Sequence, residues 1–166
     1  DYIVYLVLPA QLILILWSKR ELFKKIILLQ VISLLALIPW LPVFNQQLET
    51  GKAAAMILPN WAQVVGGGTM KNVALLFVKT IVGRISFDNQ LVYGVMVGIP
   101  GLIYSWLIIL GAKKQTWQIK LMFCWVIIPI ILALIISIFI PVFSYFRMLF
   151  ILPAVYLLTA KGLDNL

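Results

Sequence analysis

Long apolar runs follow one another along the chain and are separated by short links that carry much of the charge. Five such runs cover residues 2–17, 26–44, 91–110, 121–140 and about 141–160. They lack the alternating pattern of a membrane barrel strand, and a helix satisfies its own backbone hydrogen bonds within lipid. The pattern predicts an all-α integral membrane protein in which residues 1–166 form one module with about five transmembrane helices.

Composition supports this prediction. Of the 166 residues, 64% are hydrophobic and 11% are charged, and the mean hydropathy is +1.11. An ordinary soluble domain has roughly 45–50% apolar residues and more charge with which to cover its surface. The net charge of +8 does not indicate a nucleic-acid partner, because the basic residues flank apolar runs. There they orient helices and meet the anionic headgroups of the lipid bilayer.

The basic residues also predict which helix ends face the cytoplasm. The links 18–25 and 112–120 are short and densely basic, and Lys161 follows the last run. Short basic loops stay on the cytoplasmic side. The segment 45–90, which carries its basic residues at lower density, is therefore expected outside.

The outer segment 45–90 is too long for a simple hairpin connection, and it contains one amphipathic stretch at about 71–86. Helical spacing places polar and small residues on one face, Asn72, Lys79, Gly83 and Ser86. The opposite face is apolar, with Ala74, Phe77, Val78, Ile81 and Ile85. This stretch is too short and too charged to span, so it predicts an interfacial or re-entrant helix. The glycines at 66–68 would act as a hinge before it.

Residues for several common site chemistries are missing or scattered. The chain has no histidine and a single cysteine, Cys124, which removes His-based metal sites and the commonest general base. The acidic residues are not spaced to share a proton or to hold a metal ion. The run of three glycines lacks the spacing of a phosphate-binding loop. We therefore expect neither a metal nor a cofactor.

Arg147 stands out because it lies inside the fifth apolar run. Residues 148–160 would form a helix of about 20 Å, which is shorter than a ~30 Å hydrocarbon core, and Lys161 marks the inner end. The helix is therefore expected to extend outward through Arg147, which places the guanidinium near the outer boundary. There it is either a snorkelling anchor aided by Tyr145 in the aromatic belt, or a functional ligand for a phosphate. The residues alone leave both interpretations open.

Two more cations, Lys79 and Arg84, lie in the outer segment. The simpler interpretation is that both snorkel from an interfacial helix. The alternative is that they help to bind the phosphate of a lipid.

Four stretches carry a resemblance to a known family. They are "DYIVYLVLPAQLILIL" from Asp1, "LIPWLPVFNQQL" (37–48), "FVKTIVGRISFDNQLVYG" (77–94) and "FRMLFILPAVYLLTAKGL" (146–163). In this order they resemble bacterial membrane glycosyltransferases of family 39, which belong to the GT-C class together with protein mannosyltransferases and the lipid A aminoarabinose transferase. The chain departs from the family pattern at Met148, where Tyr is typical after the arginine, and at Asp1, where His often precedes the tyrosine.

The resemblance implies an enzyme of the bacterial plasma (inner) membrane. It would move a sugar from a polyprenyl-phosphate-linked donor to a lipid, glycan or protein acceptor on the outer face. The family's catalytic acid lies in its first outer loop, so the resemblance places that acid upstream of Asp1 and makes the chain the C-terminal part of a larger helical bundle. Arg147, Arg84, Lys79 and Tyr145 would bind the donor phosphate, and the segment 45–90 would be a lid.

Two other functions fit the same residues. A fragment of a multi-span transporter or lipid flippase explains the spans and Arg147 equally well, although the chain shows no internal repeat of the kind found in many such proteins. A non-catalytic structural subunit is the third hypothesis, and it requires no function of Arg147.

Overall fold

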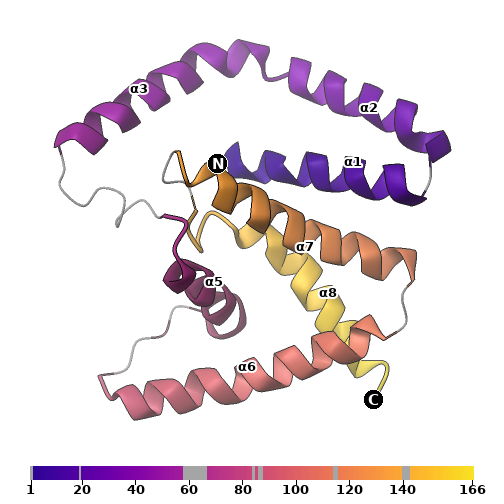
Figure 1. Cartoon of the computed structure of the whole chain (residues 1–166), viewed down its shortest axis with the longest axis vertical. Coiled ribbons are helices and arrows are strands. Elements are labelled where there is room, and N and C mark those ends of the chain that lie inside the picture. Colours follow the sequence, from indigo (N-terminus) through magenta and orange to yellow (C-terminus); the bar gives the residue numbers. More distant parts are fainter. Residues whose placement is uncertain are drawn as a thin grey trace.

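The computed structural model describes residues 2–18, 20–57, 67–83, 85, 88–113, 116–139 and 143–166, and this part of the chain is all-helical. The chain forms α-helices (α), which Figure 1 labels, and short 3₁₀ helices (η). In chain order they are η1 (Tyr2–Leu6), α1 (Val7–Ser18), α2 (Arg20–Leu35), η2 (Ile38–Trp40), α3 (Leu41–Ile57), α5 (Met70–Val82), α6 (Gln90–Ala112), α7 (Trp117–Ile136), η3 (Leu149–Ile151) and α8 (Leu152–Leu163). The predicted all-α class is confirmed.

Among the described residues, three helical segments are long and apolar enough to cross a membrane. They are Glu21–Ala54, Gln90–Ala112 and Trp117–Ile136. Two shorter apolar helices, Ile3–Trp17 and Leu149–Leu163, correspond to the first and last predicted runs. Membrane-spanning length is therefore shown for three of the five predicted crossings.

The second apolar run does not end where the sequence predicted. The expected boundary was residue 44, but α3 carries the helix on to Ile57. Pro39 and Pro42 lie in the first turns of η2 and α3, where a missing N–H interrupts no helical hydrogen bond. The chain therefore bends at η2 and continues as a helix. The whole segment Glu21–Ala54 has 34 residues, about 50 Å at helical rise, so it exceeds a ~30 Å hydrocarbon core.

The prediction of a helix running outward through Arg147 is wrong. Residues 145–148 form a turn, and η3 and α8 begin after it. Pro153 lies in the first turn of α8. In a continuous α-helix its ring would clash with the carbonyl four residues earlier, at Leu149. The chain avoids this clash by a 3₁₀ turn, which leaves Arg147 on the connection between α7 and α8.

The predicted amphipathic helix at about 71–86 is present as α5, but it is shorter. Thr69 caps its start, accepting a hydrogen bond from Asn72 N–H at 3.3 Å. Gly83 ends it with a φ of 78°, a conformation that glycine adopts without steric cost. The side that packs inward carries Leu76 and Thr80, whereas Phe77 from the predicted apolar face is 45% exposed. The predicted apolar face is therefore not the side of α5 that packs most closely on the rest of the protein.

Each helix of the main group packs against one or two others. α1 lies against α2 and α7, α7 against α8, α8 against α6, and α6 against α5. Figure 1 shows α2 and α3 as a bent arm beside this group. The ends of α1, α6 and α8 and the starts of α2 and α7 lie on the same side of the molecule in this view, which is the side that the basic residues mark.

α6 and α8 cross with their backbones in contact. A Cβ atom at Gly111 would lie 2.5 Å from the carbonyl oxygen of Leu158, and a Cβ atom at Gly162 would overlap the backbone of Leu107. Next to this point Asn165 Nδ2 donates to the Leu110 carbonyl oxygen at 3.3 Å. Small residues allow such close approach between membrane helices, where van der Waals packing holds the pair together.

Gly111→Ala should therefore destabilise the fold by about 1–3 kcal/mol, the usual range for overpacking. Gly98→Ala on the same helix is the matched control, because nothing lies within 4 Å of its added Cβ. It should be neutral or stabilise by up to about 1 kcal/mol. Unfolding in mixed detergent micelles, followed by the loss of helical circular dichroism, measures both. Equal stability of the two variants would contradict the close crossing.

Candidate functional site

The connection from α7 to η3 is anchored by two fully buried side chains. Phe143 and Met148, at the two ends of residues 143–148, are both 0% exposed. The Phe143 N–H donates to Ser137 Oγ at 2.8 Å, and the Arg147 N–H donates to the Ser144 carbonyl oxygen at 3.1 Å. The backbone that carries Arg147 is thus held both by packing and by hydrogen bonds.

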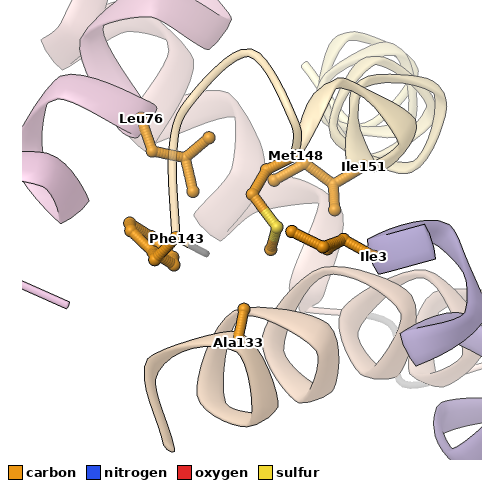
Figure 2. Close-up of a cluster of buried hydrophobic side chains, with 6 residues drawn as sticks. All are labelled: Ile3, Leu76, Ala133, Phe143, Met148 and Ile151. Atoms are coloured by element: carbon orange, nitrogen blue, oxygen red, sulfur yellow. The ribbon is translucent and has the colours of Figure 1, made fainter. Parts of the chain in front are cut away.

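These two side chains belong to a buried apolar cluster, shown in Figure 2. Its members are Ile3, Leu76, Ala133, Phe143, Met148 and Ile151. They come from η1, α5, α7, the connection and η3, so segments far apart in the sequence meet at this point. Figure 2 shows Ala133 pointing toward the space between Phe143 and Met148. The cluster therefore sets where the turn at Arg147 lies.

The Arg147 side chain is half-buried and rests against an aromatic ring. Its Cζ lies 5.8 Å from the centroid of the Phe146 ring, within the distance at which a guanidinium is attracted to a ring face. Phe146 in turn meets Tyr145 edge-on, with 5.6 Å between centroids and 87° between planes. The Phe146 ring is thus in contact with both neighbouring side chains, Tyr145 and Arg147.

Partial burial changes the electrostatics of Arg147, which lies outside the segments of spanning length. Desolvation lowers the pKa of the Arg147 guanidinium below its ordinary value, because burial disfavours the charged form. Arginine nevertheless keeps its proton in proteins. A cation that is partly removed from water attracts an anion more strongly than an exposed one, since the effective dielectric constant is lower. Arg147 is therefore suited to bind an anion.

Four residues were predicted to bind the donor phosphate, and the structure places them differently. Tyr145 and Arg147 are on the same turn and both lie against Phe146. Lys79 is on α5, which joins the cluster through Leu76, and its Nζ donates to the Ile85 carbonyl oxygen at 3.3 Å. Arg84 lies outside the described residues.

One polar group of this turn was missed by the sequence analysis. Ser144 is 5% exposed, and its Oγ is buried without a hydrogen-bond partner among the residues that the structure describes. Buried polar groups are nearly always hydrogen-bonded, so this hydroxyl is an exception beside a cation. A serine within an apolar stretch carries no sequence signal for such a role.

Two of the described carboxylates form ion pairs with lysines of their own helical turn. Glu49 pairs with Lys52 at 3.0 Å and Asp164 pairs with Lys161 at 3.1 Å, and these side chains are exposed. Within the same residues, no group of three or more His, Cys, Asp or Glu is placed to hold a metal ion. The turn carries a guanidinium, and hydroxyls lie on or beside it; both kinds of group are able to bind anions.

A second feature that the sequence analysis missed lies at the other end of α1 and α7. A pocket of about 470 Å³ opens between α1, α2 and the start of α7. Gln30 at its wall is only 8% exposed, and its Nε2 donates to the Leu8 carbonyl oxygen and to Gln11 Oε1, both at 3.3 Å. Its sequence signal is the presence of amides at 11 and 30 within otherwise apolar runs.

Substitutions at the neighbouring residues Phe143 and Ser144 should have different effects on the stability of the fold. Phe143→Ala should cost about 3–5 kcal/mol, because it leaves a cavity in the cluster. Ser144→Ala should be neutral or stabilise by up to about 1 kcal/mol, because it removes a buried hydroxyl that has no partner in the described part of the chain. Both are measured by unfolding in mixed micelles. A large loss of stability in Ser144→Ala would show that the hydroxyl is hydrogen-bonded in the folded protein.

No family model matches the chain, and no curated protein or solved structure matches it either. These comparisons therefore assign no role to Arg147 or to the pocket.

Proposed function

We propose that the chain is part of a membrane glycosyltransferase that moves a sugar from a polyprenyl-phosphate-linked donor to a lipid, glycan or protein acceptor on the outer face of the membrane. The observation that carries the proposal is the position of Arg147. The guanidinium sits on a turn held by a buried cluster, at the helix ends opposite those marked by basic links. The resemblance of residues 146–163 to a late helix of family 39 enzymes supports the same function.

The reaction needs a cation at this level of the membrane. The prenyl chain of the donor stays among the lipid tails, while its phosphate and sugar lie at the surface. As the bond between the anomeric carbon and the phosphate oxygen breaks, the electron pair stays on that oxygen and the negative charge of the phosphate increases. A guanidinium binds two phosphate oxygens at once and stabilises this developing charge. Arg147 is the residue we assign to this step.

Neighbouring groups fit supporting roles. Tyr145 lies on the turn and Ser144 directly precedes it, and both carry hydroxyls. The Ser144 hydroxyl, which has no hydrogen-bond partner within the described ranges, is assigned as a donor for a phosphate oxygen of the donor lipid. Lys79 adds a second cation from α5. Because residues up to 57 belong to α3, we reduce the proposed lid from the whole of 45–90 to α5, which packs on the turn through Leu76. Such a cover would exclude water during transfer.

The proposed orientation places the basic helix ends in the cytoplasm of a bacterial cell and the turn at Arg147 outside the plasma membrane. It follows from the rule that short basic loops remain inside. The arrangement of the helix ends supports it, because the ends next to the basic links gather on one side of the molecule.

The assignment of Arg147 is tested in membranes that contain the full-length protein, a labelled polyprenyl-phosphate sugar and acceptor. Arg147→Ala should nearly abolish sugar transfer without loss of folded protein, because the developing charge is no longer stabilised. Lys79→Ala should reduce transfer less. The matched control is Lys71→Ala, an exposed cation of α5, which should leave the rate unchanged.

Transfer at the wild-type rate in Arg147→Ala would make this residue an anchor only. Movement of the donor across the membrane without sugar transfer by the wild-type protein would favour the transporter or flippase instead.

The orientation is tested with single cysteines in a Cys124→Ala background. In intact cells a membrane-impermeant maleimide should label Asp88→Cys, in the outer segment, and should spare Lys113→Cys, at the end of α6. Permeabilised cells should show labelling of both variants, which controls for reactivity. The reverse pattern would invert the proposed topology and remove Arg147 from the outer face.

A further inference from the structure

We propose that the pocket between α1, α2 and α7 binds one anionic glycerophospholipid, taken from the leaflet next to the basic helix ends. This inference does not depend on the proposed sugar transfer, because the pocket lies at the opposite end of α1 and α7 from the turn that carries Arg147. It rests on the walls of the pocket, on the hydrogen-bond donors within it and on the cations at its edge.

The walls suit an acyl chain. Leu8 and Ile15 of α1, Ile26 and Leu29 of α2, and Leu121 of α7 all line the pocket. Its volume of about 470 Å³ falls within the range of roughly 300–1,000 Å³ found for small-molecule sites, which are mostly apolar with a few placed polar groups. The pocket therefore has the size and surface to hold part of a lipid tail.

Some of the polar groups at the pocket are hydrogen-bond donors that lack an acceptor among the described residues. Gln11 Oε1 already accepts from Gln30 Nε2, whereas Gln11 Nε2 has no acceptor in the part of the chain that the structure describes. Gln11 also lines a small neighbouring cavity together with Trp125, whose Nε1–H is buried and has no acceptor as far as the chain is described. A donor without an acceptor in an apolar site is unfavourable, so this pocket favours a ligand with acceptor oxygens.

The two ester carbonyls of a glycerophospholipid are such acceptors, and they lie between its phosphate and its tails. A polyprenyl phosphate has no oxygen below its phosphate, so it would leave these donors unpaired. The amides therefore favour the glycerophospholipid over a prenyl lipid as the occupant.

Two lysines are placed to meet the phosphate. Lys25 lies one helical turn from the pocket residues Leu22 and Leu29 on α2, and Lys120 lies next to Leu121 on α7. Both side chains are exposed, and neither pairs with a carboxylate in the described ranges. Helical rise puts Gln30 about 7.5 Å along the axis from Lys25, so the amides lie deeper than the ammonium groups. In a glycerophospholipid the ester groups likewise lie deeper in the membrane than the phosphate, so phosphate would meet the lysines and esters would meet the amides.

The first experiment measures which lipid stays with the protein. The full chain is reconstituted in nanodiscs of phosphatidylcholine with a minor share of phosphatidylglycerol, extracted in mild detergent and analysed by native mass spectrometry. Phosphatidylglycerol should be retained several-fold above its share of the bilayer. The double variant Lys25→Gln/Lys120→Gln should reduce retention to that share. Lys24→Gln, on another face of α2, is the matched control and should behave as wild type.

The second experiment tests the amides by comparing ester-linked with ether-linked phosphatidylglycerol, which lacks the carbonyl oxygens. The wild-type chain should prefer the ester lipid. Gln11→Leu should lose this preference, and Gln46→Leu on α3 should retain it. Helical circular dichroism and elution volume verify that each variant is folded.

Several results would overturn the proposal. In the first experiment these are no enrichment of phosphatidylglycerol on the wild type, or a loss of retention in Lys24→Gln equal to that in the double variant. In the second they are equal retention of ester and ether lipids by the wild type. Displacement of phosphatidylglycerol by a polyprenyl phosphate would also overturn it. None of these measurements uses sugar transfer, so a failure here and a failure of the proposed function are distinguishable.

Discussion

The packing of Phe143 and Met148 is the interaction on which the position of Arg147 depends. Both side chains are fully buried, and burial of a Phe or Met side chain contributes about 1.5–3 kcal/mol relative to exposure. The contact between Arg147 and the Phe146 ring contributes less, about 0.5–1 kcal/mol at a partly exposed site. Apolar packing therefore decides where the turn lies, and the aromatic contact only orients the guanidinium on it.

The long helices are the part of the fold that the sequence predicts well. The predicted runs 91–110 and 121–140 correspond to α6 and α7, Gln90–Ala112 and Trp117–Ile136. In lipid, a long uncharged run satisfies its own backbone hydrogen bonds by forming a helix, so hydrophobicity alone identifies these two helices. The apolar surface of these helices does not predict which helices pack together. Helices in a membrane associate through close contacts, such as that of Gly111 with Leu158, and these contacts depend on the residues of the partner helix.

Helix boundaries and sites needed information that hydropathy does not contain. Near Pro42 and Pro153 the chain stays apolar, yet proline geometry decides whether a helix restarts or turns. The packed side of α5 runs through Leu76 and Thr80 because the buried cluster and α8 lie there, and Tyr156 of α8 donates to the Thr80 carbonyl oxygen at 3.5 Å. The hydrogen bond between Gln30 and Gln11 joins α2 to α1, so neither glutamine alone predicts the pocket from the sequence.

The candidate site and the pocket, at opposite ends of α1 and α7, both contain cationic groups and hydrogen-bond donors. One end presents a guanidinium with hydroxyls, and the other presents ammonium groups above amides. Both sets consist of groups that are able to bind anions, and the residues named in them include no carboxylate or imidazole that could exchange a proton at neutral pH. Glycosyl transfer also requires a base to activate the acceptor. In the proposed enzyme the described residues therefore bind the donor phosphate and stabilise its charge, and the proton transfer belongs to side chains other than these.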